Sequence, residues 1–308
     1  MRKILWAVVI VGLALPLHAY IVNQKRLGNG VANVKWASMP VTWRMNTTAG
    51  SNITGSRTIS AVADTSFASW TGITTATITV ARGANITDNT EQDKYGYDQI
   101  NLVKTNQMQS QYDATGAGSA LAITGITTSL TTGDILDADI IFNPSITFST
   151  DASLSSSSTS YDFESVLTHE VGHFFGLDHS AILSATMFPR VRAGNSAPRV
   201  LSDDDKAGVS ALYPSSTYSS RGSISGTVRL PSGTVYGAIV VAVDSNGKPA
   251  AHGVSDNRGN YTIYGLPAGT YQVYAEPMDA PYEFSDQGVL GNIFSGSTIS
   301  TAFTTRFR

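Results

Sequence analysis

The chain has 308 residues, of which 42% are hydrophobic and 14% are charged, and its net charge is −3. This length predicts about two domains with cores of their own, and the net charge indicates neither a nucleic-acid surface nor a polybasic membrane patch. Because the chain has no cysteine, disulfides, thiolate metal ligands, a cysteine nucleophile and a cysteine-based latency switch are all excluded.

The first residues have the pattern of a secretory signal peptide. Arg2 and Lys3 precede an apolar run at 4–17, and the tripeptide LHA at 17–19 resembles a cleavage site. We predict cleavage after Ala19 and a secreted, extracellular protein. An uncleaved membrane anchor is the alternative, but a run of 14 residues is shorter than the roughly 20 needed to span a bilayer.

The next part of the chain predicts a strap followed by a sheet. Residues 20–38 are polar and contain neither Asp nor Glu, so this N-terminal strap has no carboxylate with which to mask a metal. Apolar residues at helical spacing predict a helix at 55–70. Alternation and runs of Ile, Val and Thr predict strands at 40–45, 76–81, 99–105, 120–128 and 135–142, which together indicate a mixed sheet.

The stretch HEVGHFFGLDH at 169–179 carries the chemistry. It occupies the end of a helix predicted at 161–177, on which residues four apart share a face. His169 and His173 can therefore direct ring nitrogens at one ion, and Glu170 lies beside them as a general base for a water on the metal.

The third histidine requires the helix to end. On a continuing helix His179 would lie roughly 240° around the axis from His173 and point away from the ion. Gly176 lies between them, and glycine adopts a left-handed cap at little cost. A bare HExxH can occur by chance on an amphipathic helix, but three of the five histidines of the chain fall in this window, which favours a zinc site.

A final helix and a second domain follow. Ser202 and the three aspartates at 203–205 predict a helix at 202–212, because they suit its N-cap and the positive end of its dipole. The polar run SSTYSSR at 215–221 predicts a linker. Short runs broken by Gly and Pro then predict the strands of a small all-β sandwich, at 223–230, 238–243, 260–264 and 270–275.

Four features together resemble the matrixins, the matrix-metalloprotease family of metzincin zinc endopeptidases. They are the zinc motif, Ser180 directly after it, Met187 eight residues beyond His179, and LSDDDKAGVSALYP at 201–214. The resemblance covers about residues 36–214. It implies an α+β catalytic domain with a twisted mixed five-stranded sheet, three helices and one catalytic zinc held by His169, His173 and His179.

The same resemblance implies roles for other residues. Met187 would form the turn beneath the metal, and Asp204 and Asp205 would support that turn and the mature N-terminus. The substrate-binding residues would be Leu121 and Ala122 on an edge strand, Ser165 at the base of a deep hydrophobic pocket, and Pro189 in the wall of that pocket. The chain departs from the family's Pro-x-Tyr at Pro189-Arg190-Val191, so this wall differs from the usual one.

Two further departures concern metals. Ile123 and Asp139 stand where animal members of the family carry histidines for a second, structural zinc, so we predict that this zinc is absent. Asp134, Asp137 and Asp139 offer oxygen ligands for calcium, and a solvated acidic loop is the alternative interpretation.

The second domain resembles carboxypeptidase-regulatory-like or prealbumin-like modules, which are spacers or binding units. The match is carried by Gly259, Tyr261, Leu266, Pro267, Gly269 and Tyr271. The predicted organisation is a signal peptide (1–19), the strap (20–38), the protease (39–214), the linker (215–221), the module (222–278) and a C-terminal segment with room for further strands (279–308).

The predicted function is that of a secreted zinc endopeptidase associated with the extracellular matrix. It would hydrolyse protein or peptide substrates through a zinc-bound water activated by Glu170. The alternative is a catalytically weak, zinc-stabilised adhesion or binding protein. We expect no nucleic-acid partner, no membrane span after signal cleavage, a surface protein or glycan as ligand of the module, and a monomer.

Overall fold

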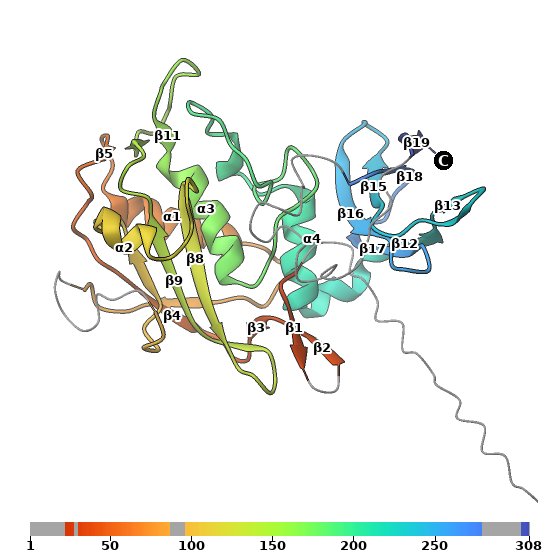
Figure 1. The fold of residues 1–308 in the computed structure, drawn as a ribbon, viewed down its shortest axis with the longest axis horizontal. Helices are drawn as coiled ribbons and strands as arrows, with labels where there is room; N and C mark the ends of the chain where they lie inside the picture. The colour runs from red at the N-terminus through yellow and green to blue at the C-terminus, as the bar shows by residue number, and fades with distance from the viewer. Residues whose placement is uncertain (1–21, 28–29, 87–95, 279–302, 308) are drawn as a thin grey trace, which may run out of the picture.

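The computed structural model describes residues 22–27, 30–86, 96–278 and 303–307 (Figure 1). The predicted signal peptide and most of the C-terminal segment lie outside the described residues. Within them, no helix has the length and apolar character needed to cross a membrane.

The described residues up to 214, called the protease part below after their predicted role, are built on a mixed sheet of six strands. Its order is β3 (Lys35–Trp36), β9 (Asp134–Phe142), β7 (Leu102–Lys104), β4 (Val41–Met45) and β6 (Val80–Arg82), with β8 (Ala122–Thr128) on β9. Neighbouring strands are parallel except β8, which runs antiparallel to β9. The prediction of five strands was wrong by one, because the end of the strap pairs with the start of β9 and adds β3.

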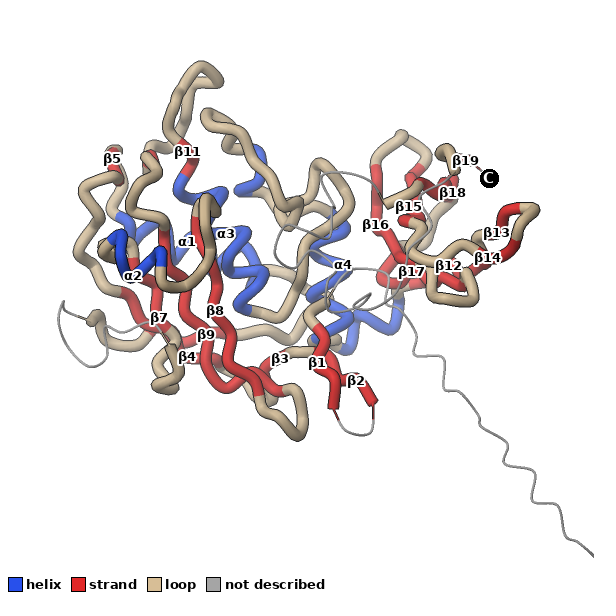
Figure 2. Tube along the Cα trace, in the orientation of Figure 1, coloured by secondary structure: helices blue, strands red, loops and turns tan. Residues whose placement is uncertain are grey.

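Two long helices pack together along this sheet (Figure 2). Helix α1 (Ile59–Thr71) begins after Thr58, whose side chain accepts a hydrogen bond from the amide of Ala61, and α3 (Phe163–Phe174) begins after Asp162. The ring of Phe67 in α1 stacks on Trp43 of β4 and meets Phe174 of α3 edge-on. These buried rings connect the sheet to the helix that carries the histidine motif.

Two more α-helices complete the protease part among the described residues, so the prediction of three helices was wrong by one. Helix α4 (Asp203–Leu212) was predicted, whereas α2 (Gln109–Asp113) is a short helix in a segment without clear apolar periodicity. The smaller elements are β1 (Gln24–Leu27), β2 (Gly30–Asn33), β5 (Ile53–Thr54), β10 (Phe148–Ser149), β11 (Tyr161–Asp162) and the 3-10 helices η2 (Ala197–Arg199) and η3 (Ser216–Ser220).

Residues 222–278, called the C-terminal module below, are all-β. One sheet pairs β12 (Gly222–Thr227) with β17 (Asn260–Leu266), and the other has the order β16 (Pro249–Val254), β15 (Ile239–Asp244), β18 (Tyr271–Glu276), β19 (Arg306–Phe307). A hairpin joins β13 (Arg229–Leu230) and β14 (Gly233–Thr234). Strand β16 was not predicted, because its sequence PAAHGV is rich in residues with low β-propensity.

Candidate metal and catalytic site

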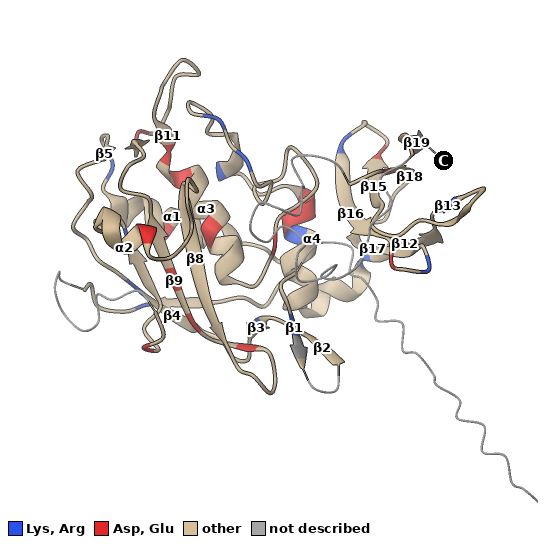
Figure 3. Ribbon diagram, viewed as in Figure 1, with Lys and Arg blue, Asp and Glu red and all other residues tan. Residues whose placement is uncertain are grey.

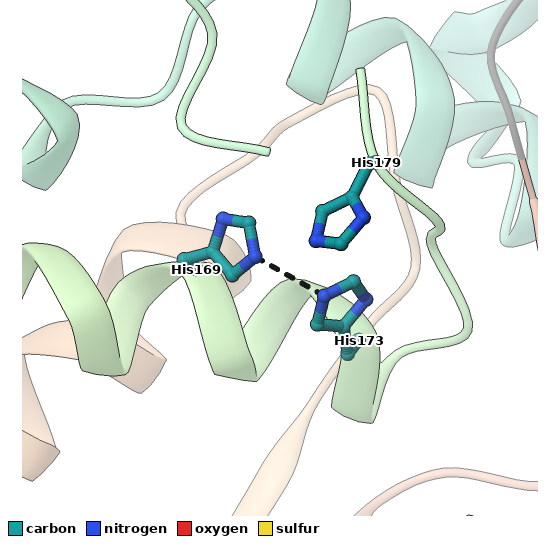
Figure 4. A group of neighbouring side chains, drawn as sticks. All are labelled: His169, His173 and His179. Atoms are coloured by element: carbon teal, nitrogen blue, oxygen red, sulfur yellow. Dashed lines mark hydrogen bonds between the residues drawn. The ribbon is translucent and has the colours of Figure 1, made fainter. Parts of the chain in front are cut away.

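Three histidines converge at the end of α3 (Figure 4). One nitrogen from each of His169, His173 and His179 lies within 4.8 Å of the others, and among the described residues no other group of three or more His, Cys, Asp or Glu residues meets this condition. His169 and His173 are one helical turn apart on the same face of α3, and His179 reaches them from the segment that follows the helix.

The ring orientations of the first two histidines are set by backbone carbonyls. His169 Nδ1 lies 2.7 Å from the carbonyl oxygen of Thr186, and His173 Nδ1 lies 2.8 Å from that of Leu177. Because a carbonyl only accepts hydrogen bonds, each ring carries its proton on Nδ1. The unprotonated Nε2 atoms then face each other at 3.1 Å.

This arrangement fits a zinc ion. Burial lowers the pKa of His169 to about 3, lowers that of His173, and lowers that of His179 well below its ordinary value. Neutral rings have no proton to place between the facing nitrogens, and neutral imidazole is the form that binds metals. Tetrahedral zinc with bonds of about 2.0–2.1 Å requires nitrogens roughly 3.3 Å apart, close to the observed spacing.

The helix ends where the motif requires it to end. Gly176 has a φ of +93°, its amide donates to the carbonyl of His173, and the amide of Leu177 donates to that of Gly172. This pair of hydrogen bonds is a Schellman motif, which satisfies the last carbonyls of the helix. The chain then turns so that His179 returns toward the face of α3.

The N-terminal strap closes over this turn. The amide of Asn23 donates to the carbonyl of Gly176, and its side chain donates to that of Leu177. A Cβ added at Gly176 would lie only 2.1 Å from the carbonyl oxygen of Val34. Glycine is therefore required here for its conformation and for the close approach of the strap.

Met187 packs against α3 at Gly172, between the positions of His169 and His173. It is 1% exposed, and a Cβ added at Gly172 of α3 would lie 2.2 Å from its sulfur. Asp205 accepts hydrogen bonds from the amides of Met187 (3.0 Å) and Thr186 (2.8 Å), and the carbonyl of Thr186 in turn orients His169. The first turn of α4 is thus connected through Thr186 and Met187 to the ring of His169, one of the predicted metal ligands.

Asp204, the other aspartate of the predicted pair, has different partners. Its carboxylate accepts hydrogen bonds from Ser180 and from His252. The mature N-terminus predicted for this position falls at residue 20, outside the described residues, so that contact stays a prediction.

Glu170 is held by the edge strand of the sheet. It is 5% exposed, and Thr124 Oγ1 in β8 lies 2.6 Å from its Oε2. Burial raises the pKa of Glu170 to about 7, and the hydrogen bond from Thr124 opposes this rise. A carboxyl group with a pKa near neutrality can both accept and return a proton at pH 7.

The predicted substrate-binding residues lie around this site. Ala122 begins β8, Leu121 directly precedes it, and β8 lies beside α3. Ser165 is 1% exposed, one turn before His169, and its Oγ has no hydrogen-bond partner among the described residues. Pro189 is partly buried, two residues after Met187.

The residues predicted for other metals occupy β8 and β9. Ile123 pairs with Ile141 in the sheet. Asp137 and Asp139 are both 1% exposed, and Asp139 accepts hydrogen bonds from the amides of Gly96 and Leu102. The solvated-loop interpretation is therefore wrong for this pair, whereas Asp134 is less buried and bonds Thr132.

Two residues at the site were missed by the sequence analysis. Thr124 has no local pattern that marks it, since it is separated from Glu170 by 46 positions. His252 was not singled out, and its strand β16 was not predicted. The signal available for His252 was its rarity, since only one of the five histidines falls in the module.

The mixed sheet carries a helix whose two histidines converge with a third, beside a buried glutamate and with Met187 packed on the helix, an arrangement suited to a metal site with a general base. Comparison with known families agrees: the matrixin family model matches residues 35–214, more than half of the chain, and the carboxypeptidase regulatory-like domain matches residues 223–279. The chain belongs to the matrixin family.

Curated relatives match the chain over a short part. Metalloendoproteinase 1-MMP of Arabidopsis thaliana is 48% identical over 62 residues, which are 19% of this chain and 16% of the relative. Matrilysin of Rattus norvegicus is 42% identical over 52 residues, 17% of this chain and 20% of the relative. The aligned regions thus span a fifth or less of these relatives.

Proposed function

We propose that the protein is a secreted zinc endopeptidase in which His169, His173 and His179 hold one catalytic ion. The observation that carries the proposal is the pair of unprotonated Nε2 atoms of His169 and His173, 3.1 Å apart with both Nδ1 protons engaged elsewhere. When bound, zinc supplies a Lewis acid that polarises the scissile carbonyl and acidifies water.

Glu170 is the general base in this proposal. Its carboxylate takes a proton from the attacking water and passes it to the leaving amine. Thr124 holds the carboxylate in place from β8, which fixes the position from which the proton is accepted. A cation at the histidines favours the ionised form of Glu170 and so prepares it to act as a base.

The substrate is proposed to bind as an added strand. Among the described strands β8 pairs with β9 alone, so an extended peptide can align with its other edge at Leu121 and Ala122. Ser165 and Pro189 would form the base and wall of the pocket for one substrate side chain. Preference for small residues just after the cleaved bond, in a peptide library, would contradict a deep pocket.

The test is hydrolysis of casein by the purified protein, compared with the variant Glu170→Gln. Glutamine keeps the volume of the side chain and cannot accept the proton, so we expect kcat/KM to fall by about 10²–10⁴. Zinc content, measured by elemental analysis, should stay at one ion per chain in both proteins, and a zinc chelator should abolish activity. Equal activity of the two proteins would refute the mechanism.

The same experiment separates the alternative, a zinc-stabilised binding protein. Such a protein would bind zinc and show no hydrolysis above the Glu170→Gln background. The retained glutamate and its hydrogen bond from Thr124 favour the peptidase.

The remaining parts of the proposal concern location and partners. Secretion is proposed from the signal-peptide pattern at 1–19. N-terminal sequencing of the secreted protein should find Tyr20 as its first residue. Calcium is proposed at Asp137 and Asp139, whose buried carboxylates share one face of β9. We propose a monomer whose C-terminal module binds a surface protein or glycan.

A further inference from the structure

The C-terminal module packs against the helix that supports the methionine turn. Helix α4 lies between α3 and the module in Figure 1, and both β16 and β17 contact it. A Cβ added at Gly265 of β17 would lie 2.8 Å from the Cβ of Ala207 in α4. The two surfaces therefore approach each other as closely as elements within one core.

The module also packs on part of residues 180–187, the segment from the third histidine to Met187. Ala181, Ile182 and Ala185 are each at most 8% exposed. They form one apolar cluster with residues of the module, namely Ile239, Val241, Val254 and Met278. The conformation of this segment is thus stabilised by side chains that the protease part does not contain.

A buried polar bridge accompanies the apolar contact. Asp204 Oδ1 accepts hydrogen bonds from the amide of His252 (3.0 Å) and from its Nδ1 (2.9 Å), while Asp204 Oδ2 accepts one from Ser180 Oγ (2.6 Å). All three residues are at most 3% exposed. Asp204 belongs to the acidic start of α4 (Figure 3), and Ser180 directly follows His179.

A second observation connects His252 to the metal site. His252 Nε2 and His179 Nδ1 are buried, and neither has a hydrogen-bond partner among the described residues. Both residues line the same cavity of about 10 Å³, together with Asp178 and Met187. This volume is about that of one water-sized sphere, and one water there would accept from His179 Nδ1 and donate to His252 Nε2.

We propose that the C-terminal module is part of the scaffold of the zinc site, and that His252 is a positioning residue for His179. It acts through Asp204 and Ser180 on the segment that carries the third ligand. This inference rests on the proposed zinc site and adds to it a role for a module whose family is otherwise associated with spacers and binding units.

The test is the zinc affinity of the full-length protein, measured by competition with a chromogenic chelator. We expect His252→Ala to weaken zinc binding by about 10-fold, as for other residues that orient metal ligands. His252→Asn should restore the affinity to within about 3-fold, because its amide can donate to Asp204. The control is Ile263→Ala, which empties a buried position of the module in β17 and removes no hydrogen bond to Asp204.

Hydrogen exchange provides a readout independent of zinc. In His252→Ala the amides of residues 180–187 should exchange faster, whereas Ile263→Ala should leave them unchanged. If His252→Ala does not fold, as judged by circular dichroism, Ser180→Ala removes the other bond to Asp204 and should weaken zinc binding similarly.

The outcomes separate this inference from the proposed function. A wild-type protein that binds no zinc contradicts the proposed function itself. A wild-type protein that binds zinc, beside a folded His252→Ala or Ser180→Ala with unchanged affinity, contradicts only the role of His252. Equal weakening by His252→Ala and Ile263→Ala would also overturn it, because general loss of module stability would then be the cause.

Discussion

Replacement of Gly176 by alanine tests how the strap holds the turn between α3 and His179. Two effects of Gly176→Ala oppose folding. A φ of +93° strains an L-residue by about 1–2 kcal/mol, and the new Cβ, 2.1 Å from the carbonyl oxygen of Val34, forces the strap to move at a cost of about 1–3 kcal/mol. Alanine also reduces the entropy of the unfolded chain, which stabilises by about 0.4–1 kcal/mol.

The net expectation is a loss of about 1–5 kcal/mol in the free energy of unfolding. Urea unfolding followed by tryptophan fluorescence measures it, because Trp36, Trp43 and Trp70 all lie in the protease part. The matched control is Gly116→Ala. Gly116 has a φ of +76° with nothing within 4 Å of an added Cβ, so it reports the backbone strain alone.

The difference between the two variants isolates the contact with the strap. We expect Gly116→Ala to cost about 1 kcal/mol or less, since strain and unfolded-state entropy nearly cancel. Equal losses in the two variants would refute the argument that the strap presses on the turn. A zinc affinity that is weaker in Gly176→Ala but unchanged in Gly116→Ala would show that displacement of the turn also displaces His179.

Three further predictions concern other parts of the site. The Thr124 hydroxyl lowers the pKa of Glu170, so Thr124→Val should move the acidic limb of the kcat/KM profile to higher pH, while Thr124→Ser should not. Asp205→Asn removes a charged acceptor from buried amides and should lower the free energy of unfolding by about 2–3 kcal/mol, as measured in urea. Asp203→Asn, at a more exposed position, should lower it by less than about 1 kcal/mol. A smaller loss for Asp205 than for Asp203 would contradict its supporting role. Burial raises the pKa of Asp139 from 3.8 to about 8, so its folded form holds a proton that the unfolded form releases, and metal-free stability should fall as pH rises from about 4 to 8. Asp139→Asn should flatten this dependence. An unchanged slope in the variant would contradict the assignment of the pH dependence to Asp139.

Several local features could be predicted because neighbouring residues encode them. The spacing of His169 and His173 determined that they share a helical face, and Gly176 determined where that face ends. Ser202 predicted the start of α4, where it forms a capping box with Asp205. These features depend on the geometry of one or two helical turns, which residue type and spacing define.

Other features could not be predicted because their partners are distant in the chain. The strap was recognised as polar, yet nothing in its sequence indicated that β3 would join the sheet. Nor did it indicate that the carbonyl of Val34 would approach the turn at Gly176 closely. Strand β16 was missed because its small residues have low β-propensity, and its stability comes from pairing with β15.

The chemistry of the site was therefore determined by the sequence, and its support was decided by the tertiary structure. Residue types and their spacing within residues 169–179 were enough to indicate zinc and a general base. The contacts of Thr124 with Glu170 and of His252 with Asp204 join positions 46 and 48 residues apart. Such pairs form only when separate elements pack, because the free energy that brings them together comes from the burial of the surrounding apolar surface.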